Sequence, residues 1–151
     1  QSPNGAYAAV IPKWTASLLT GEKVFINGDG ETSRDFCYID NVVQINILAA
    51  TTYLVNVSEV QKSINPALNQ VYNVAVSDNT TLNSLFSLLR SNLAAYDVDA
   101  NTQPVYRDFR AGDVRHSHAD ISKAQRLLGY VPTQRLAEGI AKAVPWYVAQ
   151  K

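Results

Sequence analysis

Residues Gly28–Asp40 read Gly-Asp-Gly-Glu-Thr-Ser-Arg-Asp-Phe-Cys-Tyr-Ile-Asp, and this stretch is the most informative part of the chain. Two glycines permit a tight turn, and Arg34 follows the turn beside Asp35. Arginine suits a diphosphate because its planar guanidinium donates two parallel hydrogen bonds and stays charged. The turn begins like a dinucleotide fingerprint, but Ser33 stands where the third glycine belongs. The stretch therefore indicates a phosphate-directed arginine and no Rossmann phosphate loop.

Length and composition narrow the class of protein. The 151 residues suffice for one ordinary domain with a real core. Thirteen basic and thirteen acidic side chains leave no net charge, which argues against nucleic acid or an anionic membrane as a partner. The single cysteine, Cys37, fits a reducing compartment, and we expect a cytoplasmic protein. Gln1–Gly5 lacks an initiator methionine, so we expect the inside of a longer protein.

Apolar spacing, capping residues and turn residues predict an alternation of helices and strands. Helices are expected at Ala8–Leu19 with Gly21 as the stop, at Asp40–Tyr53 capped by Asp40, after a cap at Thr80 or Thr81, at Ile121–Leu128 after a cap at Asp120, and at Leu136–Gln150, bent or broken near Pro145. Strands are expected at Val24–Ile26 and Val71–Val76, an extended segment at Gln103–Phe109, and a variable surface loop at Asn56–Asn69.

This order predicts a mixed α/β fold with too few strands for a complete doubly wound sheet. The helix at Asp40–Tyr53 is apolar all round, and Val71–Val76 is almost unbroken by polar residues. Both are therefore expected to be covered on two sides. We expect the isolated chain to expose an apolar surface where a further domain docks.

A second arginine stands in a comparable setting. Arg110 lies two residues before Gly112, which lets a backbone approach a ligand closely. Two such arginines with a few backbone donors could account for micromolar nucleotide binding. The alternative is that these arginines pair with nearby carboxylates as surface salt bridges. His116 and His118 supply two metal ligands without a third, which does not predict a metal site.

Five segments stand in a specific order and spacing: Pro3–Trp14, Gly28–Asn41, Tyr72–Ala75, Arg110–Ser117 and Pro145–Tyr147. Together they resemble the C-terminal part of extended short-chain dehydrogenase/reductases, of the bacterial UDP-N-acetylglucosamine 4-epimerase type. The resemblance implies that residues 1–151 form the substrate-binding portion, with mixed short strands and helices and without a complete Rossmann sheet. It also implies that the NAD-binding Rossmann domain lies before Gln1.

The resemblance assigns substrate-binding roles to nine positions. Arg34 and Arg110 would grip the diphosphate of UDP, and Asp113 would accept a hydrogen bond from the uridine ribose. Ser117 stands where enzymes for plain hexoses carry a bulky tyrosine, so it would admit an N-acetyl group. Other positions would lie near the phosphates, border the uracil or contact the substrate: Val10, Phe25, Ile26, Asn27 and Phe36.

The implied reaction is NAD-dependent oxidation and re-reduction at C4 of a UDP-N-acetylhexosamine for bacterial polysaccharide precursors. The catalytic residues would lie before Gln1, so we expect the chain alone to be inactive. The resemblance is also compatible with a homodimer of the longer enzyme. Tyr147 and Lys151 match a Tyr-x-x-x-Lys pair, but they stand at the end of the chain, so we assign them no catalytic role. Alternatives are the same region of a nucleotide-sugar dehydratase, decarboxylase or reductase, and a non-catalytic interaction module.

Overall fold

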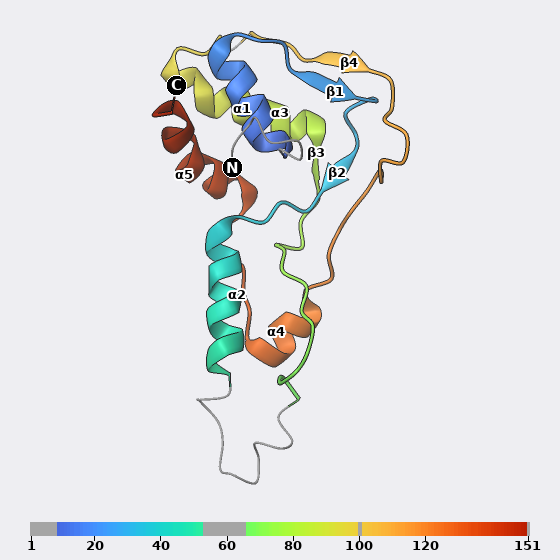
Figure 1. The fold of residues 1–151 in the computed structure, drawn as a ribbon, viewed down its shortest axis with the longest axis vertical. Coiled ribbons are helices and arrows are strands. Elements are labelled where there is room, and N and C mark those ends of the chain that lie inside the picture. Colours follow the sequence, from blue (N-terminus) through green and yellow to red (C-terminus); the bar gives the residue numbers. More distant parts are fainter. Residues whose placement is uncertain (1–8, 53–65, 100, 151) are drawn as a thin grey trace. The chain divides into compact units, whose positions relative to one another are not determined.

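A computed structural model describes residues 9–52, 66–99 and 101–150 (Figure 1). The chain divides into two compact units. The first unit comprises Gln1–Arg34, Thr80–Ser117 and Ala137–Lys151, and the second comprises Asp35–Asn79 and His118–Leu136. Most of the expected loop at Asn56–Asn69 lies outside the described residues, and its last four residues form a turn.

Helices build the core of the first unit. They are α1 (Val10–Thr20), α3 (Leu82–Leu93), the 3₁₀ turn η2 (Ala94–Tyr96) and α5 (Leu136–Val148), whose first residue belongs to the second unit. Helix α1 packs on α3, where the rings of Trp14 and Phe86 meet edge to face with centroids 6.2 Å apart (Figure 1). The inner face of α3 is buried, as the apolar spacing predicts: Leu85, Phe86, Leu89 and Leu93.

Local signals explain the helix ends of this unit. Gly21 ends α1 in the left-handed conformation at φ +73°, which confirms the predicted stop. The Thr81 hydroxyl accepts a hydrogen bond from the Ser84 amide at 3.1 Å, which confirms the predicted cap of α3. Helix α5 is not broken near Pro145, because it runs through this residue as one helix, and a bend at this residue stays a prediction. Proline removes one helical hydrogen bond, and the remaining packing of α5 holds the turn together.

Two short sheets complete the first unit. Strand β1 (Phe25–Asn27) pairs in parallel with β4 (Val105–Arg107), and β2 (Ser33–Arg34) pairs antiparallel with β3 (Thr80–Thr81). The predictions of a strand near Val24–Ile26 and of an extended segment before Phe109 are confirmed. The described residues contain no complete Rossmann sheet, so the predicted fold class is confirmed.

The second unit pairs α2 (Ile39–Thr51) with α4 (Ser122–Leu128). Its core holds Ile45, Ala67, Ala75, Ile121, Ala124, Leu128 and Tyr130. The Asp120 carboxylate accepts from the Ser122 amide at 2.8 Å, but the predicted cap at Asp120 stands one residue too early, because Ile121 occupies the cap position of α4. Gly129 ends that helix at φ +66°, as predicted. The predicted cap at Asp40 is wrong, because Tyr38 occupies the cap position and Asp40 lies within the first turn of α2.

The expectation that the isolated chain exposes an apolar surface agrees with α2, where Ile39, Val43 and Ile47 are 58%, 49% and 57% exposed, so the described residues do not cover this helix on all sides. The predicted strand at Val71–Val76 is wrong, because the segment forms no strand, and Val71 is 85% exposed. The physical reason is shared: a strand needs a neighbouring ladder and an apolar face needs a neighbouring layer, and the described residues supply neither here. Within those residues, no helix combines the length and apolarity that crossing a membrane requires.

Candidate functional site

Arg34 is held in place by three acceptors. Its Nη1 donates to the backbone oxygens of Ser33 at 2.7 Å and Arg115 at 3.4 Å. Its Nη2 donates to Asp113 Oδ1 at 3.2 Å, and the side chain is 29% exposed. The guanidinium has N–H groups to spare, because Nε–H and one N–H of Nη2 find no acceptor within the described residues. A fixed guanidinium edge of this kind can receive an anion through two parallel hydrogen bonds.

Arg110 and Asp113 share one turn. The Asp113 amide donates to the Arg110 carbonyl at 3.2 Å, and Gly112 adopts φ +77°, which favours glycine. The Arg110 side chain is exposed and forms no ion pair with any residue of the described ranges. The salt-bridge alternative therefore describes Arg34, which pairs with Asp113, but not Arg110. The turn brings a second cation onto the same segment as the carboxylate that holds Arg34.

Ser117 lies on a segment that is hydrogen-bonded to β2. The Ser33 amide donates to the Arg115 carbonyl at 2.8 Å, and the Ser117 amide donates to the Ser33 carbonyl at 3.2 Å. The Ser33 hydroxyl and His116 Nδ1 lie 2.8 Å apart, within hydrogen-bond distance. Ser33 is only 2% exposed, so a buried residue anchors this short parallel bridge. Arg34 and Ser117 thus stand on neighbouring, paired segments.

The turn at Gly28–Gly30, called the glycine turn, contacts the end of β4 and the segment that follows it. The Gly28 amide donates to the Arg107 carbonyl at 2.8 Å, and the Phe109 ring occupies the space that a Gly28 side chain would need. Arg115 Nη2 donates to Asp29 Oδ2 at 2.6 Å. This hydrogen bond is the main reason why the pKa of Asp29 lies below its usual value. The turn and the segment with Arg110 and Asp113 are therefore tied together.

The turn does not fit a dinucleotide pyrophosphate. It leads into β2, whereas a phosphate loop opens a helix. The Asn83 side chain fills the space beside Gly30, where a phosphate would have to approach the backbone. The interpretation that Gly28–Ser33 is no Rossmann phosphate loop is thus confirmed.

Three predicted residues form β1. The Arg107 guanidinium lies over the Phe25 ring, with Cζ 3.2 Å from the ring centroid. Asn27 is exposed, and Ile26 is completely buried. The Ile26 side chain therefore belongs to the core, and only its backbone remains for a ligand contact.

Val10 and Phe36 are the two remaining predicted residues. Val10 is the half-buried first residue of α1, and in the described part of the chain no hydrogen bond or ion pair joins it to either arginine. Phe36 is half-buried and belongs to the second unit. The structure thus brings Arg34, Asp113 and Ser117 together, and the substrate-binding roles of all nine residues stay predictions.

The two histidines do not act as a pair. His116 contacts Ser33, whereas His118 Nε2 lies 3.4 Å from the Ser77 hydroxyl in the second unit. Within the described ranges, no three potential metal ligands gather at one place. Sequence reasoning did not single out Asp29, Asn83 or Phe109. The contacts Asn83–Asp29, Asp29–Arg115 and Phe109–Gly28 each join residues more than fifty positions apart, so no local spacing signals them.

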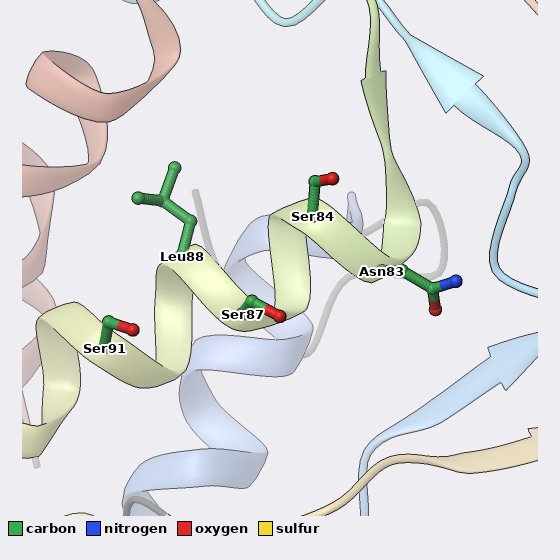
Figure 2. A pocket seen from close by; sticks show the side chains of 5 residues that line it. All are labelled: Asn83, Ser84, Ser87, Leu88 and Ser91. Atoms are coloured by element: carbon green, nitrogen blue, oxygen red, sulfur yellow. The ribbon is translucent and has the colours of Figure 1, made fainter.

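Two shallow hollows lie elsewhere on the surface. One, of about 500 Å³, follows the outer face of α3 beside Asn83, Ser84, Ser87, Leu88 and Ser91 (Figure 2). The other, of about 390 Å³, lies on α2 beside Val43, Ile47 and their neighbours. Neither hollow is lined by Arg34 or Arg110, and neither contains a charged cluster that could hold an anion.

Several known proteins are similar to this chain in sequence. The profile of the NAD dependent epimerase/dehydratase family matches residues 1–75. A UDP-glucose 4-epimerase of Mycolicibacterium smegmatis is 31% identical over 148 residues, which cover 97% of this chain and 41% of that protein. The chain is therefore similar to the NAD dependent epimerase/dehydratase family. It spans about two fifths of the length of this curated relative.

Two solved structures show the same fold as this chain. One is the UDP-glucose 4-epimerase of Thermotoga maritima with UDP-glucose, with a TM-score of 0.80 and 35% identity over 99% of this chain and 42% of that one. The other is the UDP-N-acetylglucosamine 4-epimerase of Methanobrevibacter ruminantium M1 in complex with UDP-N-acetylmuramic acid, with a TM-score of 0.80 and 35% identity over 100% and 43%. The matched region is the C-terminal portion of these enzymes.

Proposed function

We propose that this chain is the UDP-sugar-binding part of a cytoplasmic, NAD-dependent UDP-N-acetylglucosamine/UDP-N-acetylgalactosamine 4-epimerase that serves polysaccharide precursor synthesis. The family and the two solved relatives, both named as UDP-sugar 4-epimerases, support this reaction class. The observation that carries the proposal is the Arg34 guanidinium, which three acceptors fix while two N–H groups stay available. The longer enzyme that would contain this chain is called the parent below.

The role proposed for this chain is to position the substrate. The NAD cofactor, bound by a Rossmann domain of the parent, would supply hydride chemistry at C4 of the sugar. The residues described here would hold the UDP end still while the sugar presents either face. Because the diphosphate is far from the reacting carbon, its binding energy serves orientation.

The Arg34–Asp113 ion pair has a specific part in this proposal. A carboxylate 3.2 Å from the guanidinium would repel an incoming diphosphate. We propose that Asp113, which is 42% exposed, turns to the ribose hydroxyls when UDP binds and leaves Arg34 to the phosphates. The exposed Arg110 would add the second positive charge, so that two cations face two negative phosphate groups. In the free protein the ion pair keeps Arg34 in the orientation that the ligand needs.

The choice of an N-acetylated sugar rests on Ser117. The two solved relatives are equally identical to this chain but are named for different sugars, so overall similarity does not select the substrate. A serine leaves more volume beside the sugar than a tyrosine, and its hydroxyl can hydrogen-bond an acetamide. The backbone of Ser117 is fixed to Ser33, which would hold this small side chain at a constant place.

The second unit supports a docking role. Ile39, Val43 and Ile47 recur along one side of α2, and each is about half exposed. We propose that the Rossmann domain of the parent covers this side, and that the isolated chain lacks epimerase activity because the cofactor and the reacting groups belong to that domain. The test is an assay of the isolated chain with UDP-N-acetylglucosamine and NAD, in which measurable epimerisation would disprove the inactivity.

Calorimetric titration of the parent with UDP tests the anchor. Each charge-assisted hydrogen bond contributes about 1.5–3 kcal/mol, so Arg34→Ala and Arg110→Ala should each raise the Kd for UDP by about tenfold to a hundredfold. Arg126→Ala is the matched control, because it removes the same charge from an exposed position on α4. If UDP does not bind, or if all three variants bind alike, the chain is better described as a non-catalytic interaction module.

The product distinguishes the epimerase from its sibling enzymes. An epimerase converts UDP-N-acetylglucosamine to UDP-N-acetylgalactosamine without a change in mass and without net consumption of NAD. A dehydratase or decarboxylase would change the mass of the sugar, and a reductase would oxidise a nicotinamide cofactor. Chromatographic separation of the two isomers followed by mass spectrometry of the parent's reaction products therefore decides between these reactions.

A further inference from the structure

Asn83 connects the first turn of α3 to the glycine turn before Arg34. Its backbone amide donates to the Gly30 carbonyl at 3.1 Å. Its side-chain Nδ2 donates to the Asp29 carbonyl at 3.1 Å and to Glu31 Oε1 at 2.7 Å. Its Oδ1 accepts a hydrogen bond from the Tyr106 hydroxyl at 2.9 Å. One side chain thus uses both ends of its carboxamide to hold the turn and β4 together.

The backbone around the turn is built for this contact. Gly30 adopts φ +79°, and a side chain at this position would collide with the Asn83 carboxamide. The next backbone bond, from the Leu82 amide to the Thr32 carbonyl at 3.0 Å, continues the attachment of the turn to α3. In Figure 2, Asn83 lies at the N-terminal end of α3 and points away from the three serines of that helix, toward the neighbouring strands. The helix therefore contributes one side chain to the turn.

The turn that Asn83 holds leads directly to the proposed anchor. Asp29 in the turn holds the guanidinium of Arg115 at 2.6 Å. The carbonyl of Arg115 in turn accepts hydrogen bonds from the Ser33 amide and from Arg34 Nη1. Each step is a direct hydrogen bond, so a displaced turn would move the acceptors that orient Arg34.

We infer that Asn83 is a positioning residue for the UDP diphosphate anchor, acting through the glycine turn and Arg115 on Arg34. This inference rests on the proposed function. A carboxamide is needed because the site requires two N–H donors toward Asp29 and Glu31 and one acceptor toward Tyr106. Alanine supplies none of these, and aspartate supplies only the acceptor and sets a negative charge against Glu31.

The test measures UDP binding, kcat, KM and the melting temperature of the parent and its variants. Asn83→Ala should raise the Kd for UDP and the KM by about threefold to tenfold, as expected for the loss of one or two net hydrogen bonds, with a smaller effect on kcat. Asn83→Asp should weaken binding at least as much. When Asn83→Asp is combined with Glu31→Gln, the introduced glutamine amide can donate to the introduced carboxylate, so at least half of the lost affinity, on a logarithmic scale, should return.

Ser87→Ala is the matched control, because Ser87 is exposed on the same helix and stands outside the network. If Asn83→Ala lowers the melting temperature but leaves the Kd for UDP within twofold of that of Ser87→Ala, Asn83 is structural only and the inference is overturned. If Arg34→Ala still weakens UDP binding in that case, the proposed function stands. A wild-type parent that does not bind UDP would instead remove the proposed function and this inference together.

A variant that fails to fold does not end the test. Glu31→Ala and Tyr106→Phe each remove one partner of Asn83 and leave the carboxamide in place. Each should weaken UDP binding by about twofold to threefold. Unchanged binding in both variants would overturn the inference.

Discussion

Gly30→Ala tests whether the glycine turn is as tightly constrained as its contacts indicate. Gly30 has φ +79°, and an added Cβ would collide with the Asn83 carboxamide. Gly21, at the end of α1, has φ +73°, and nothing lies within 4 Å of the position of its Cβ. The two glycines therefore differ in their surroundings and hardly in their backbone conformation. Gly21→Ala is the matched control.

The expected magnitudes follow from two terms. A left-handed backbone costs an alanine about 1–2 kcal/mol, and both variants bear this cost. In Gly30→Ala, the Asn83 side chain must also rotate away and give up its hydrogen bonds to Asp29, Glu31 and Tyr106. At about 0.5–1.5 kcal/mol per bond, reduced because these groups are exposed, the added cost is about 1–3 kcal/mol. Gly30→Ala should therefore lower the free energy of unfolding by about 2–5 kcal/mol, and Gly21→Ala by about 1–2 kcal/mol.

Urea unfolding of the 151-residue chain, followed by tryptophan fluorescence, measures this difference. Both tryptophans, Trp14 and Trp146, belong to the first unit, so the signal reports the unit that contains the turn. In an Asn83→Ala background, Gly30→Ala should cost no more than Gly21→Ala, because the colliding group is gone. Equal losses for the two glycine variants in the wild-type background, within about 0.5 kcal/mol, would refute the reasoning.

Three further outcomes are expected. Ser117→Tyr in the parent should lower kcat/KM for UDP-N-acetylglucosamine at least about tenfold more than for UDP-glucose, and equal losses would count against Ser117 as the determinant of the sugar. The hydrogen bond from Arg115 lowers the pKa of Asp29 from 3.8, so the charged carboxylate stabilises the folded chain. Asp29→Asn should therefore lower the urea midpoint by its full amount above pH 3.8, and this difference from wild type should vanish as the pH falls through the lowered pKa. A difference in urea midpoints that does not shrink in acid would contradict this. Tyr130→Phe leaves the Ala75 carbonyl without its 2.8 Å donor and should cost about 1–2 kcal/mol. Burial raises the pKa of Tyr130 from 10.0 to about 12. The stabilisation by the neutral Tyr130 hydroxyl should therefore persist below pH 10 and be lost as the pH rises through 12. The tyrosinate absorbance of wild type minus that of Tyr130→Phe follows the ionisation of this residue.

The helices were predictable where their signals are local. Thr81 and the apolar spacing of α3 lie within one segment, and Gly21 and Gly129 follow the helices that they end. The start of α2 was misplaced because an acidic residue in a first turn and an acidic cap look alike in sequence. The exposure of Val43 and Ile47 agrees with the apolar surface expected for the isolated chain, but the sequence could not show which apolar residues would form it, because burial depends on a neighbouring layer.

The candidate site was predictable only in part for a similar reason. Arg34 stands out because a glycine turn and a carboxylate flank it in the sequence. Its ion pair with Asp113 joins residues 79 positions apart, and the bond between Ser33 and His116 joins residues 83 positions apart. Nothing in the local spacing of Ser33 or Asn83 distinguishes them from ordinary surface residues. Long-range backbone pairing, which forms only in the folded chain, gives these two residues their partners.

Val71–Val76 has a strand-like sequence but forms no backbone ladder with another strand of the described residues. Side chains satisfy several of its backbone groups: Lys123 donates to the Val71 carbonyl at 3.0 Å, Tyr130 to Ala75, and Arg135 to Val76 at 3.1 Å. Asp35 accepts from the Val76 amide at 3.1 Å. These contacts fix the segment within the second unit, but they leave most of its β-branched and aromatic side chains without the two-sided cover that such residues favour in sheets. This incomplete cover is why we place the segment with the exposed side of α2 in the surface that we propose the Rossmann domain covers.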